Sequence, residues 1–230
     1  MRTSRLQRRY LARRLEILRA AGREFRTRGF AETGMREIAA AADLSPANLY
    51  NYFHGKDEIL FFCQDSALDR LIANLERTCR AKAASTERLR SVIVFHLHCV
   101  LDEVEGSAAH LLTNSIPHHL QKRLLAKRDR YEQGFRHLVA RGIRSGEFFP
   151  TDPALAARAI LGALNSTVLW FNSQGPLTPD ELAENFATYL IRGLRAKSSG
   201  HARQNRDGRS LDRSTASLGK KLAKTGDPQW

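Results

Sequence analysis

The sequence lacks the long apolar runs of a membrane protein. Its longest uninterrupted apolar segments span only a few residues, whereas a transmembrane helix needs about 20. The arginine-rich beginning also lacks the separate apolar region and cleavage site of a secretory signal. Cysteine is scarce, with three residues and no CxxC pair, which argues against a disulfide framework. We therefore expect a cytoplasmic protein with reduced thiols and no membrane partner.

Catalytic motifs are missing as well. The sequence contains no GxSxG, HExxH, P-loop or dinucleotide fingerprint. His96, His98 and Cys99 are metal-ligand types that lie close together, but residues two apart on a helix diverge by about 200°, and structural zinc takes four ligands. We expect these three side chains to belong to a core or a pocket. The sequence thus predicts no catalytic residue, no metal site and no cofactor.

What the sequence has in excess is positive charge. Its 37 lysines and arginines outnumber 24 acidic residues and give a net charge of +13, which favours an anionic partner such as nucleic acid. Ten arginines against two glutamates lie in residues 1–28, and eight basic against three acidic residues lie in 197–230. Arg5, Arg8 and Arg9 are candidates for contacts with the DNA backbone or minor groove, and a disordered, solvated tail is the equal alternative.

Residues 33–56 have the pattern of a helix-turn-helix, which is two short helices joined by a tight turn. Thr33 is the expected N-cap of the first helix, because its hydroxyl precedes an apolar face at helical spacing. That face comprises Met35, Ile38, Ala39 and Ala42. The second helix is expected to begin with Ser45 as its cap and Pro46 at the first helical position, and to end at residues 54–56.

The second predicted helix has one buried and one outward face. Leu49 and Phe53 are four residues apart and share the buried face. Outward-facing asparagines can bond adenine bidentately, and tyrosine hydroxyls commonly bond phosphate. The predicted DNA-binding residues are Thr33, Arg36, Ser45, Ala47, Asn48, Tyr50, Asn51, Tyr52, His54 and Lys56. Among them, Asn48 and Asn51 are expected to read bases, and Lys56 is expected to contact phosphate.

The remaining periodic segments predict further helices. A long helix is predicted from residue 56 to about residue 81. It would start at the DNA-binding unit, end deep in the second domain and so connect the two mechanically. Further helices are predicted after Ser85 or Thr86, around 108–112, over 117–145, over 153–171 and from Pro179 through Gly193, the last with a capping box of Thr178 and Glu181. Apolar residues surround nearly the whole circumference of the 153–171 helix, more than one small domain can bury, which indicates self-association.

These residues also carry a family resemblance. The block resembles the DNA-binding domain of TetR-type (TetR/AcrR) transcriptional regulators in ILRAAGREFRTRGF at 17–30, T-x-M-x-x-I-A from Thr33, LYNYF at 49–53, and the entry into the long helix at Lys56, Asp57 and Leu60. Gly34 departs from the serine or threonine that this family usually has at that position. The resemblance implies a homodimer that pairs through its last two helices, a double-stranded DNA operator, and release by a small effector.

Together the periodicity and the resemblance predict an all-α fold. An N-terminal arm and a three-helix helix-turn-helix DNA-binding domain are expected over residues 1–55. A C-terminal helical domain for effector binding and dimerisation is expected over 56–196. Residues 197–230 are predicted to be a disordered basic tail, because they contain almost no large apolar residues.

The predicted effector pocket is apolar with a few polar atoms. Its candidate residues are Phe62, Phe95, His98, Trp170 and Phe171, for which ordinary core packing is the equal alternative. Such a lining suits a small hydrophobic effector with one polar end. The segment LNSTVLWF at 164–171, followed by a Gly-Pro break, is similar to regulators of lipid or steroid catabolism, so an acyl-CoA is the candidate effector.

The sequence therefore predicts a ligand-responsive DNA-binding transcriptional regulator, a repressor released from a palindromic operator. The main alternative is a helical CoA-thioester-binding enzyme or carrier without DNA binding, in which the basic N-terminus only attracts anionic substrate. A third possibility is a basic protein that binds any nucleic acid. Sequence-selective duplex binding would distinguish the first from both alternatives.

Overall fold

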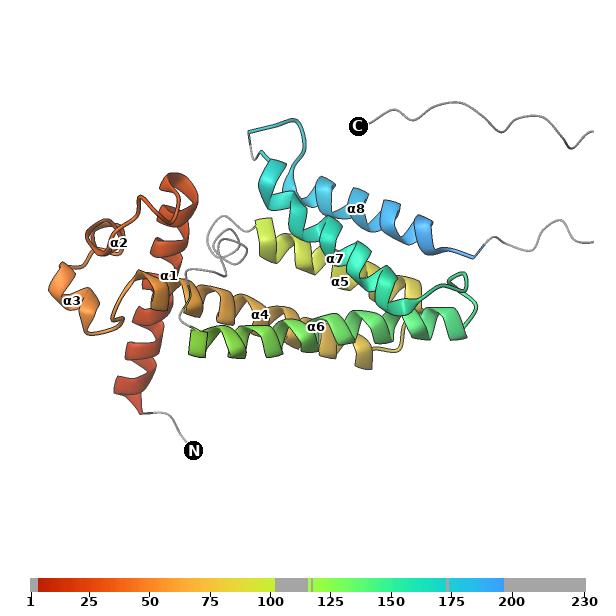
Figure 1. Cartoon of the computed structure of the whole chain (residues 1–230), viewed down its shortest axis with the longest axis horizontal. Helices are drawn as coiled ribbons and strands as arrows, with labels where there is room; N and C mark the ends of the chain where they lie inside the picture. The colour runs from red at the N-terminus through yellow and green to blue at the C-terminus, as the bar shows by residue number, and fades with distance from the viewer. Residues whose placement is uncertain (1–3, 102–115, 117, 173, 197–230) are drawn as a thin grey trace, which may run out of the picture. The chain divides into compact units, whose positions relative to one another are not determined.

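The computed structural model describes residues 4–101, 116, 118–172 and 174–196. Within these ranges the predicted all-α fold is confirmed, with one isolated β-bridge between Phe148 and Arg195. The helices are α1 (Arg5–Arg28), α2 (Met35–Ala41), α3 (Pro46–Tyr50), α4 (Lys56–Arg80), α5 (Ser85–Leu101), α6 (His118–Arg144), α7 (Pro153–Trp170) and α8 (Pro179–Leu194) (Figure 1). The helix predicted at 108–112 and the tail predicted at 197–230 lie outside the described residues.

Local capping explains where several helices begin. The Ser45 hydroxyl accepts from the Asn48 amide at 3.2 Å and starts α3, as predicted. Asp152 accepts from the Ala154 amide at 2.8 Å before α7. The predicted capping box of α8 is confirmed, since Thr178 accepts from the Glu181 amide while the Glu181 carboxylate accepts from the Thr178 amide.

Two other helix starts differ from the prediction. The N-cap of α2 is Gly34, not Thr33, and the Glu37 carboxylate accepts from the Gly34 amide at 3.0 Å. Neither Ser85 nor Thr86 caps α5 with its own hydroxyl. The carboxylate of Glu147, far along the chain, accepts from both amides at 2.9 Å instead, so a tertiary contact supplies the cap that local sequence was expected to supply.

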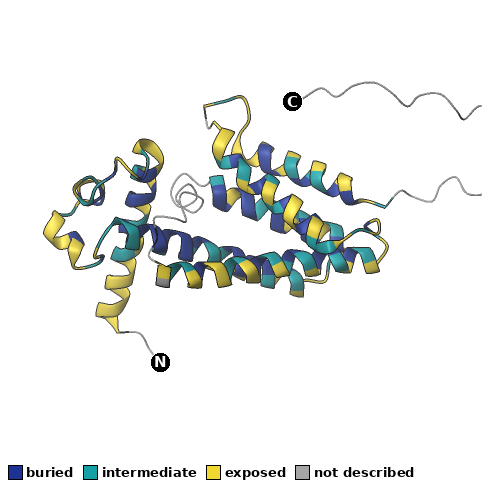
Figure 2. Cartoon of the chain, viewed as in Figure 1, coloured by how far each residue is buried: buried dark blue, intermediate teal, exposed yellow. Residues whose placement is uncertain are grey.

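The described residues pack around two hydrophobic cores, and α4 contributes to both (Figure 2). The first core joins α1, α2 and α3 to the beginning of α4 and to Ile116 and Leu124. The second lies among the rest of α4 and helices α5 to α8. From α4, the first core receives Ile59, Leu60 and Phe61, and the second receives Leu71, Ile72 and Leu75. The predicted boundary between residues 55 and 56 stays a prediction.

Helices α4 and α6 lie side by side (Figure 1). Gly134 makes their close approach possible, because a Cβ atom there would lie only 2.0 Å from Cδ2 of Leu75. Leu75 therefore packs directly against the backbone of α6. This contact and the ion pairs described below fix α6 against the long helix that enters the first core.

Helices α7 and α8 leave apolar side chains uncovered. Leu155 and Leu169 on α7 are 65% and 81% exposed, and Tyr189 on α8 is 65% exposed. Leu155, Gly162 and Leu169 are spaced seven residues apart and therefore form one stripe along α7. Across the described ranges, no helix is long and apolar enough to cross a membrane.

Candidate DNA-binding face and effector cavity

The outward face of α3 rests on two fully buried side chains. Leu49 and Phe53 have no exposed surface, and the Arg14 guanidinium lies 4.5 Å from the centre of the Phe53 ring. On the opposite face, Ser45, Ala47, Asn48, Tyr50 and Asn51 are exposed. Leu49 and Phe53 are buried and these five residues are exposed as the helical periodicity predicts, whereas Tyr52, expected on the outward face, is half-buried.

Helix α3 is shorter than predicted. It ends at Tyr50, and Asn51 is its C-cap. The chain then continues in tight turns, in which the Tyr52 and Phe53 amides both donate to the carbonyl of Leu49. Asn51 still faces outward at the end of the helix, although a helix through Phe53 was expected.

The turn between α2 and α3 is held from α1. Asp43 has a φ of 52°, and the Leu44 amide donates to the Ala39 carbonyl at 2.8 Å, which closes the end of α2 as a Schellman-type turn. Arg13 donates to the carbonyls of Ala42 at 3.0 Å and Asp43 at 3.1 Å. Arg13 thereby fixes the turn to α1, a role that its position among many arginines does not reveal.

Three of the predicted DNA-binding residues support the domain from within. Thr33 is fully buried, and its hydroxyl donates to the Gly29 carbonyl at 2.8 Å. Tyr52 is half-buried and stacks on Tyr10, with ring centres 5.1 Å apart. The ammonium of Lys56 donates to the carbonyls of Phe30, Ala31 and Thr33 at 2.9–3.1 Å. These contacts give the three residues structural roles, and their expected contacts with DNA stay a prediction.

The other predicted residues, Arg36 and His54, are exposed. The backbone amide of His54 donates to the Glu58 carboxylate, which leaves the imidazole on the surface. The candidate arginines Arg5, Arg8 and Arg9 are exposed on the first turns of α1, whose N-cap Ser4 accepts from the Gln7 amide. From residue 5 onward the basic arm is therefore a helix, and the expectation of a disordered tail does not apply there.

A cavity of about 410 Å³ lies among four helices of the second core. Its lining residues are Ala67, Leu68 and Leu71 from α4, His96 from α5, Arg128, Tyr131 and Glu132 from α6, and Arg158, Leu161, Gly162 and Asn165 from α7. Its size is within the usual range for ligand pockets. The cavity joins apolar surface from α4 and α7 to a small number of polar and charged groups.

None of the five predicted pocket residues lines this cavity. Phe62 packs against the first core, Phe95 and Phe171 are half-buried elsewhere, His98 pairs with Asp180 at 3.0 Å, and Trp170 stacks on Phe186. These five side chains therefore lie outside this cavity, and their contact with an effector stays a prediction. His96, two residues before His98, turns inward, because two residues on a helix differ by about 200°.

Hydrogen bonds organise the inner wall of the cavity. His96 is 2% exposed, and its Nδ1 lies 3.2 Å from the Tyr131 hydroxyl while its Nε2 lies 3.2 Å from Oδ1 of Asn165. Burial raises the pKa of Tyr131 well above its ordinary value, and the nearby Cys99 adds to the effect. Tyr131 therefore keeps its hydroxyl proton at neutral pH.

Charged groups also line the cavity. The Glu132 carboxylate pairs with Arg136 and, at 3.1 Å, with Arg158. Hydrogen bonds from Arg136 and then Arg158 lower the pKa of Glu132 against the opposing effect of burial. Burial lowers the pKa of Arg128, which donates to the Gln64 side chain at 3.1 Å. The cavity thus offers positive charge beside an apolar interior.

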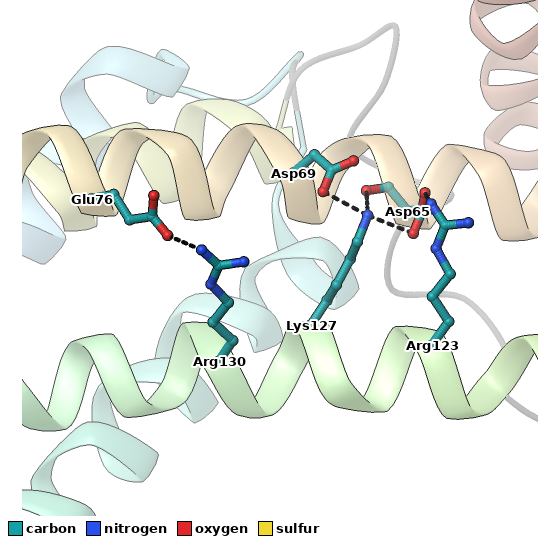
Figure 3. Close-up of polar contacts among 6 residues, drawn as sticks. All are labelled: Asp65, Asp69, Glu76, Arg123, Lys127 and Arg130. Carbon is teal, nitrogen blue, oxygen red and sulfur yellow. Dashed lines mark hydrogen bonds and ion pairs between the residues drawn. The ribbon is translucent and has the colours of Figure 1, made fainter.

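A ladder of ion pairs ties α6 to α4 (Figure 3). The carboxylate of Asp65, 7% exposed, lies 2.7 Å from Arg123 and 2.6 Å from Lys127. Lys127 also pairs with Asp69 at 2.6 Å, and Arg130 pairs with Glu76 further along the helices. Because α6 lines the cavity and α4 enters the first core, the ladder connects the cavity wall to the helix that supports the helix-turn-helix.

Helix α3 has an exposed face opposite the buried Leu49 and Phe53, and α1 holds the turn that precedes it. This is the arrangement of a helix-turn-helix DNA-binding protein. Comparisons with known proteins agree. Residues 17–61 match the profile described as "Bacterial regulatory proteins, tetR family", and residues 82–194 match "Tetracyclin repressor-like, C-terminal domain".

Individual relatives extend this likeness over most of the chain. The solved structure of the TetR family regulator PfmR from Thermus thermophilus is 31% identical, with a TM-score of 0.71, over 78% of this chain and 99% of PfmR. The repressor KstR2 of Mycobacterium tuberculosis is 25% identical over 80% of this chain and 93% of its own. AibR, solved with isovaleryl coenzyme A and operator DNA, is 26% identical with a TM-score of 0.68, over 81% of this chain and 98% of AibR.

The chain belongs to the TetR family of DNA-binding transcriptional regulators. It is therefore a regulator and not an enzyme, and the predicted alternative of a CoA-thioester enzyme is set aside on the strength of this membership.

Proposed function

We propose that this regulator is a homodimeric repressor that binds a palindromic operator and is released when an acyl-CoA occupies the cavity. The observation that carries the proposal is the course of α4, which supplies side chains both to the core beneath α3 and to the cavity. An effector that prefers one position of α4 therefore shifts the population of DNA-competent molecules.

The proposed reading surface is the outward face of α3. Asn48 and Asn51 are exposed above the buried Leu49 and Phe53 and suit bidentate contacts with adenine, and Tyr50 suits a phosphate contact. Ser45, Ala47, Arg36 and His54 complete the proposed surface. Thr33, Tyr52 and Lys56 are proposed to hold this surface in place through their hydrogen bonds and ring stacking.

The proposed dimer forms through α7 and α8. The exposed stripe of Leu155, Gly162 and Leu169 on α7, together with Tyr189 on α8, is apolar surface that a second copy would bury. A Cβ atom at Gly162 would meet nothing within 4 Å in one chain, so this position is open to a partner helix. A two-fold dimer suits the task, because one short helix reads few base pairs and half-sites lie about 34 Å apart.

The proposed effector class rests on the cavity and on relatives. Apolar side chains of α4 and α7 suit an acyl chain, and Arg128 and Arg158 suit an anionic group. AibR was solved with isovaleryl coenzyme A and operator DNA, and a fatty acid metabolism regulator of Bacillus subtilis is 23% identical over 80% of this chain. These relatives support an acyl-CoA for the present protein.

Selection of bound fragments from a random duplex library tests the DNA proposal. The wild type should select a palindrome. Asn48→Ala and Asn51→Ala should each lose about 1–3 kcal/mol of discrimination at one base position. Gln133→Ala, which removes an exposed amide on α6, is the matched control and should select the same palindrome with equal affinity. Unchanged operator affinity in both α3 variants would refute the proposed reading surface.

The effector proposal requires a second measurement on the selected operator. Titration with acyl-CoAs should weaken operator binding 5- to 150-fold, which corresponds to about 1–3 kcal/mol of coupling. Reciprocally, operator DNA should weaken acyl-CoA binding by the same factor. If saturating acyl-CoA leaves the operator affinity unchanged, the proposed effector class is wrong while the DNA-binding proposal stands.

A further inference from the structure

Three side chains on three helices form a hydrogen-bonded chain at the cavity wall. His96 on α5 lies between Tyr131 on α6 and Asn165 on α7, at 3.2 Å from each. All three line the cavity, with His96 and Tyr131 buried and Asn165 at the exposed end. The chain of contacts therefore runs from the core to the space where a ligand would lie.

The direction of each hydrogen bond follows from the atoms involved. With Oδ1 of Asn165 facing Nε2 of His96, the ring nitrogen is the donor of this bond, because a carboxamide oxygen only accepts. In the neutral imidazole Nδ1 is then an acceptor, and the Tyr131 hydroxyl donates to it. In this arrangement Tyr131 donates, Asn165 Oδ1 accepts, and His96 does one of each. The carboxamide oxygen of Asn165 is consequently held toward His96.

Fixing the oxygen also fixes the other half of the carboxamide. The amide nitrogen of Asn165 is on the opposite side from Oδ1, and it carries two donors. Among the described residues, no hydrogen bond from this nitrogen to a protein acceptor is found. Asn165 therefore presents N–H groups to a cavity whose neighbouring surfaces include the apolar side chains of Leu68, Leu71 and Leu161.

We propose that Asn165 recognises the effector by donating to a carbonyl oxygen, while the apolar side chains of α4 and α7 accept the adjoining hydrocarbon chain. The inference rests on the proposed role of the cavity as the effector site and specifies what is read there. His96 and Tyr131 line the same cavity, and we assign them a positioning role because their hydrogen bonds orient the carboxamide. An acyl thioester has the required carbonyl next to a hydrocarbon chain, and so has the free acid.

The test compares ligands that differ only at the carbonyl. Isovaleryl-CoA and longer straight-chain acyl-CoAs are titrated against the full-length protein, together with S-alkyl-CoA thioethers that carry a methylene in place of the carbonyl. The wild type should bind a thioester about tenfold more tightly than its thioether, the effect of one hydrogen bond. Free acids of the same chains distinguish the two sources of the carbonyl. Weaker binding of the acids would assign the thioester.

Two substitutions at Asn165 test the donor. Asn165→Asp keeps an acceptor for His96 but removes the amide hydrogens, and Asn165→Leu removes both functions. Each should reduce the thioester-to-thioether ratio to about one. Ser166→Ala removes the neighbouring hydroxyl, which donates to the Ala163 carbonyl, and should retain the wild-type ratio. Thermal unfolding of each variant checks that it is folded.

Tyr131→Phe tests the positioning role. Loss of the hydroxyl frees Nδ1 of His96 to take the hydrogen, so the carboxamide is no longer held in one orientation. The thioester preference should fall while the binding of the thioether stays near the wild-type value, because the hydrocarbon contacts remain. A purely structural role of Tyr131 would weaken both ligands equally.

The outcomes separate this inference from the proposed function. If the wild type binds thioester and thioether equally, or if Asn165→Asp keeps the preference, carbonyl recognition by Asn165 is refuted, while the effector role of the cavity stands. If the wild type binds none of the acyl-CoAs, their thioethers or the free acids, the proposed effector class and this inference fall together.

Discussion

At the scale of single residues, Lys56 joins the start of α4 to the segment before α2. Its ammonium donates to three backbone carbonyls and lies 4.7 Å from the centre of the Phe30 ring. Lys56→Met keeps the apolar stem but removes every donor, so the free energy of unfolding should fall by about 1–3 kcal/mol. Denaturant unfolding measures the loss.

The salt dependence of operator binding distinguishes this structural role from a phosphate contact. For Lys56→Met, the slope of log K against log salt should stay at the wild-type value. Arg36→Gln is the control on the exposed surface of α2. It should reduce the slope by about 0.9 if Arg36 contacts one phosphate, with stability changed by no more than about 0.5 kcal/mol. A reduced salt slope for Lys56→Met would show that Lys56 contacts a phosphate.

Glu147 predicts a specific dependence of stability on pH. Burial opposes ionisation of its carboxyl, but hydrogen bonds from Thr86, Ser85 and Ser145 outweigh this and lower the pKa from 4.5 to about 2. A pKa depressed in the folded state contributes stability above the unfolded value of 4.5, and this stability is lost as pH falls toward 2. Glu147→Gln should therefore cost roughly 1–3 kcal/mol at neutral pH.

Unfolding measured from pH 7 down to acid checks this prediction. In Glu147→Gln the decrease in stability through the acid range should be smaller than in the wild type, because the titrating group is gone. Glu87→Gln alters an exposed carboxylate in the first turn of the same helix and should change stability by only about 0.5 kcal/mol. Equal pH profiles for wild type and Glu147→Gln would contradict the capping role.

Some residue roles follow from local sequence and others do not. Ser45 and Thr178 are caps because the partner amide is within the same helix, so a short sequence window contains the whole interaction. The cap predicted at Thr33 was wrong by one position, since the glycine after it starts α2 and its own hydroxyl turns into the core. Glu147 could not be predicted, because its partners are about sixty residues away in the sequence.

At the scale of helices, the ion-pair ladder between α4 and α6 predicts unequal costs along its length. The Asp65 carboxylate is 7% exposed, whereas the side chains of Glu76 and Arg130 are 39% and 66% exposed. Asp65→Ala leaves the mostly buried Lys127 with Asp69 as its remaining carboxylate partner, and should cost about 2–4 kcal/mol. Glu76→Ala on the same helix should cost less than about 1 kcal/mol, because solvent screens that pair.

Denaturant unfolding of the two variants in parallel compares the two ends of the ladder. The same variants can be assayed for coupling between effector and operator. If the ladder transmits the position of α6 to α4, Asp65→Ala should also reduce the coupling, while Glu76→Ala should retain it. Equal stability costs at both ends would show that burial does not govern these pairs.

Helix boundaries were predictable to within one residue for α4, α6 and α7, because an apolar stripe persists until a breaking residue. The cavity was not. Which of His96 and His98 turns inward depends on the rotation of α5 against its neighbours, and both lie in a segment rich in apolar residues. Sequence periodicity places a stripe on a helix, but packing among four helices decides which part of that stripe borders empty space.

At the scale of the whole molecule, the uncovered surface of α7 and α8 predicts self-association. Leu155→Glu combined with Tyr189→Glu places charges on two exposed positions, so each chain should still fold. Sedimentation equilibrium should show a dimer for the wild type and a monomer for the double variant. The double variant should also bind the operator more weakly than the wild type, because a monomer engages only one half-site.

An exposed leucine elsewhere supplies the control for this experiment. Leu125 on α6 is 50% exposed, and Leu125→Glu introduces the same chemistry away from α7 and α8. It should remain dimeric and bind the operator as the wild type does. A dimeric double variant would mean that the copies associate through another surface.

The unbroken course of α4 has a mechanical consequence. A helix without a break has no hinge and moves as one body. A displacement at Leu68 or Leu71 therefore also displaces Ile59 and Leu60. Ligand occupancy would then change the tilt of α3 without unfolding anything between. Substitution of two neighbouring residues in the middle of α4 by glycine, which keeps the helical register, should leave operator binding intact and abolish the response to the effector.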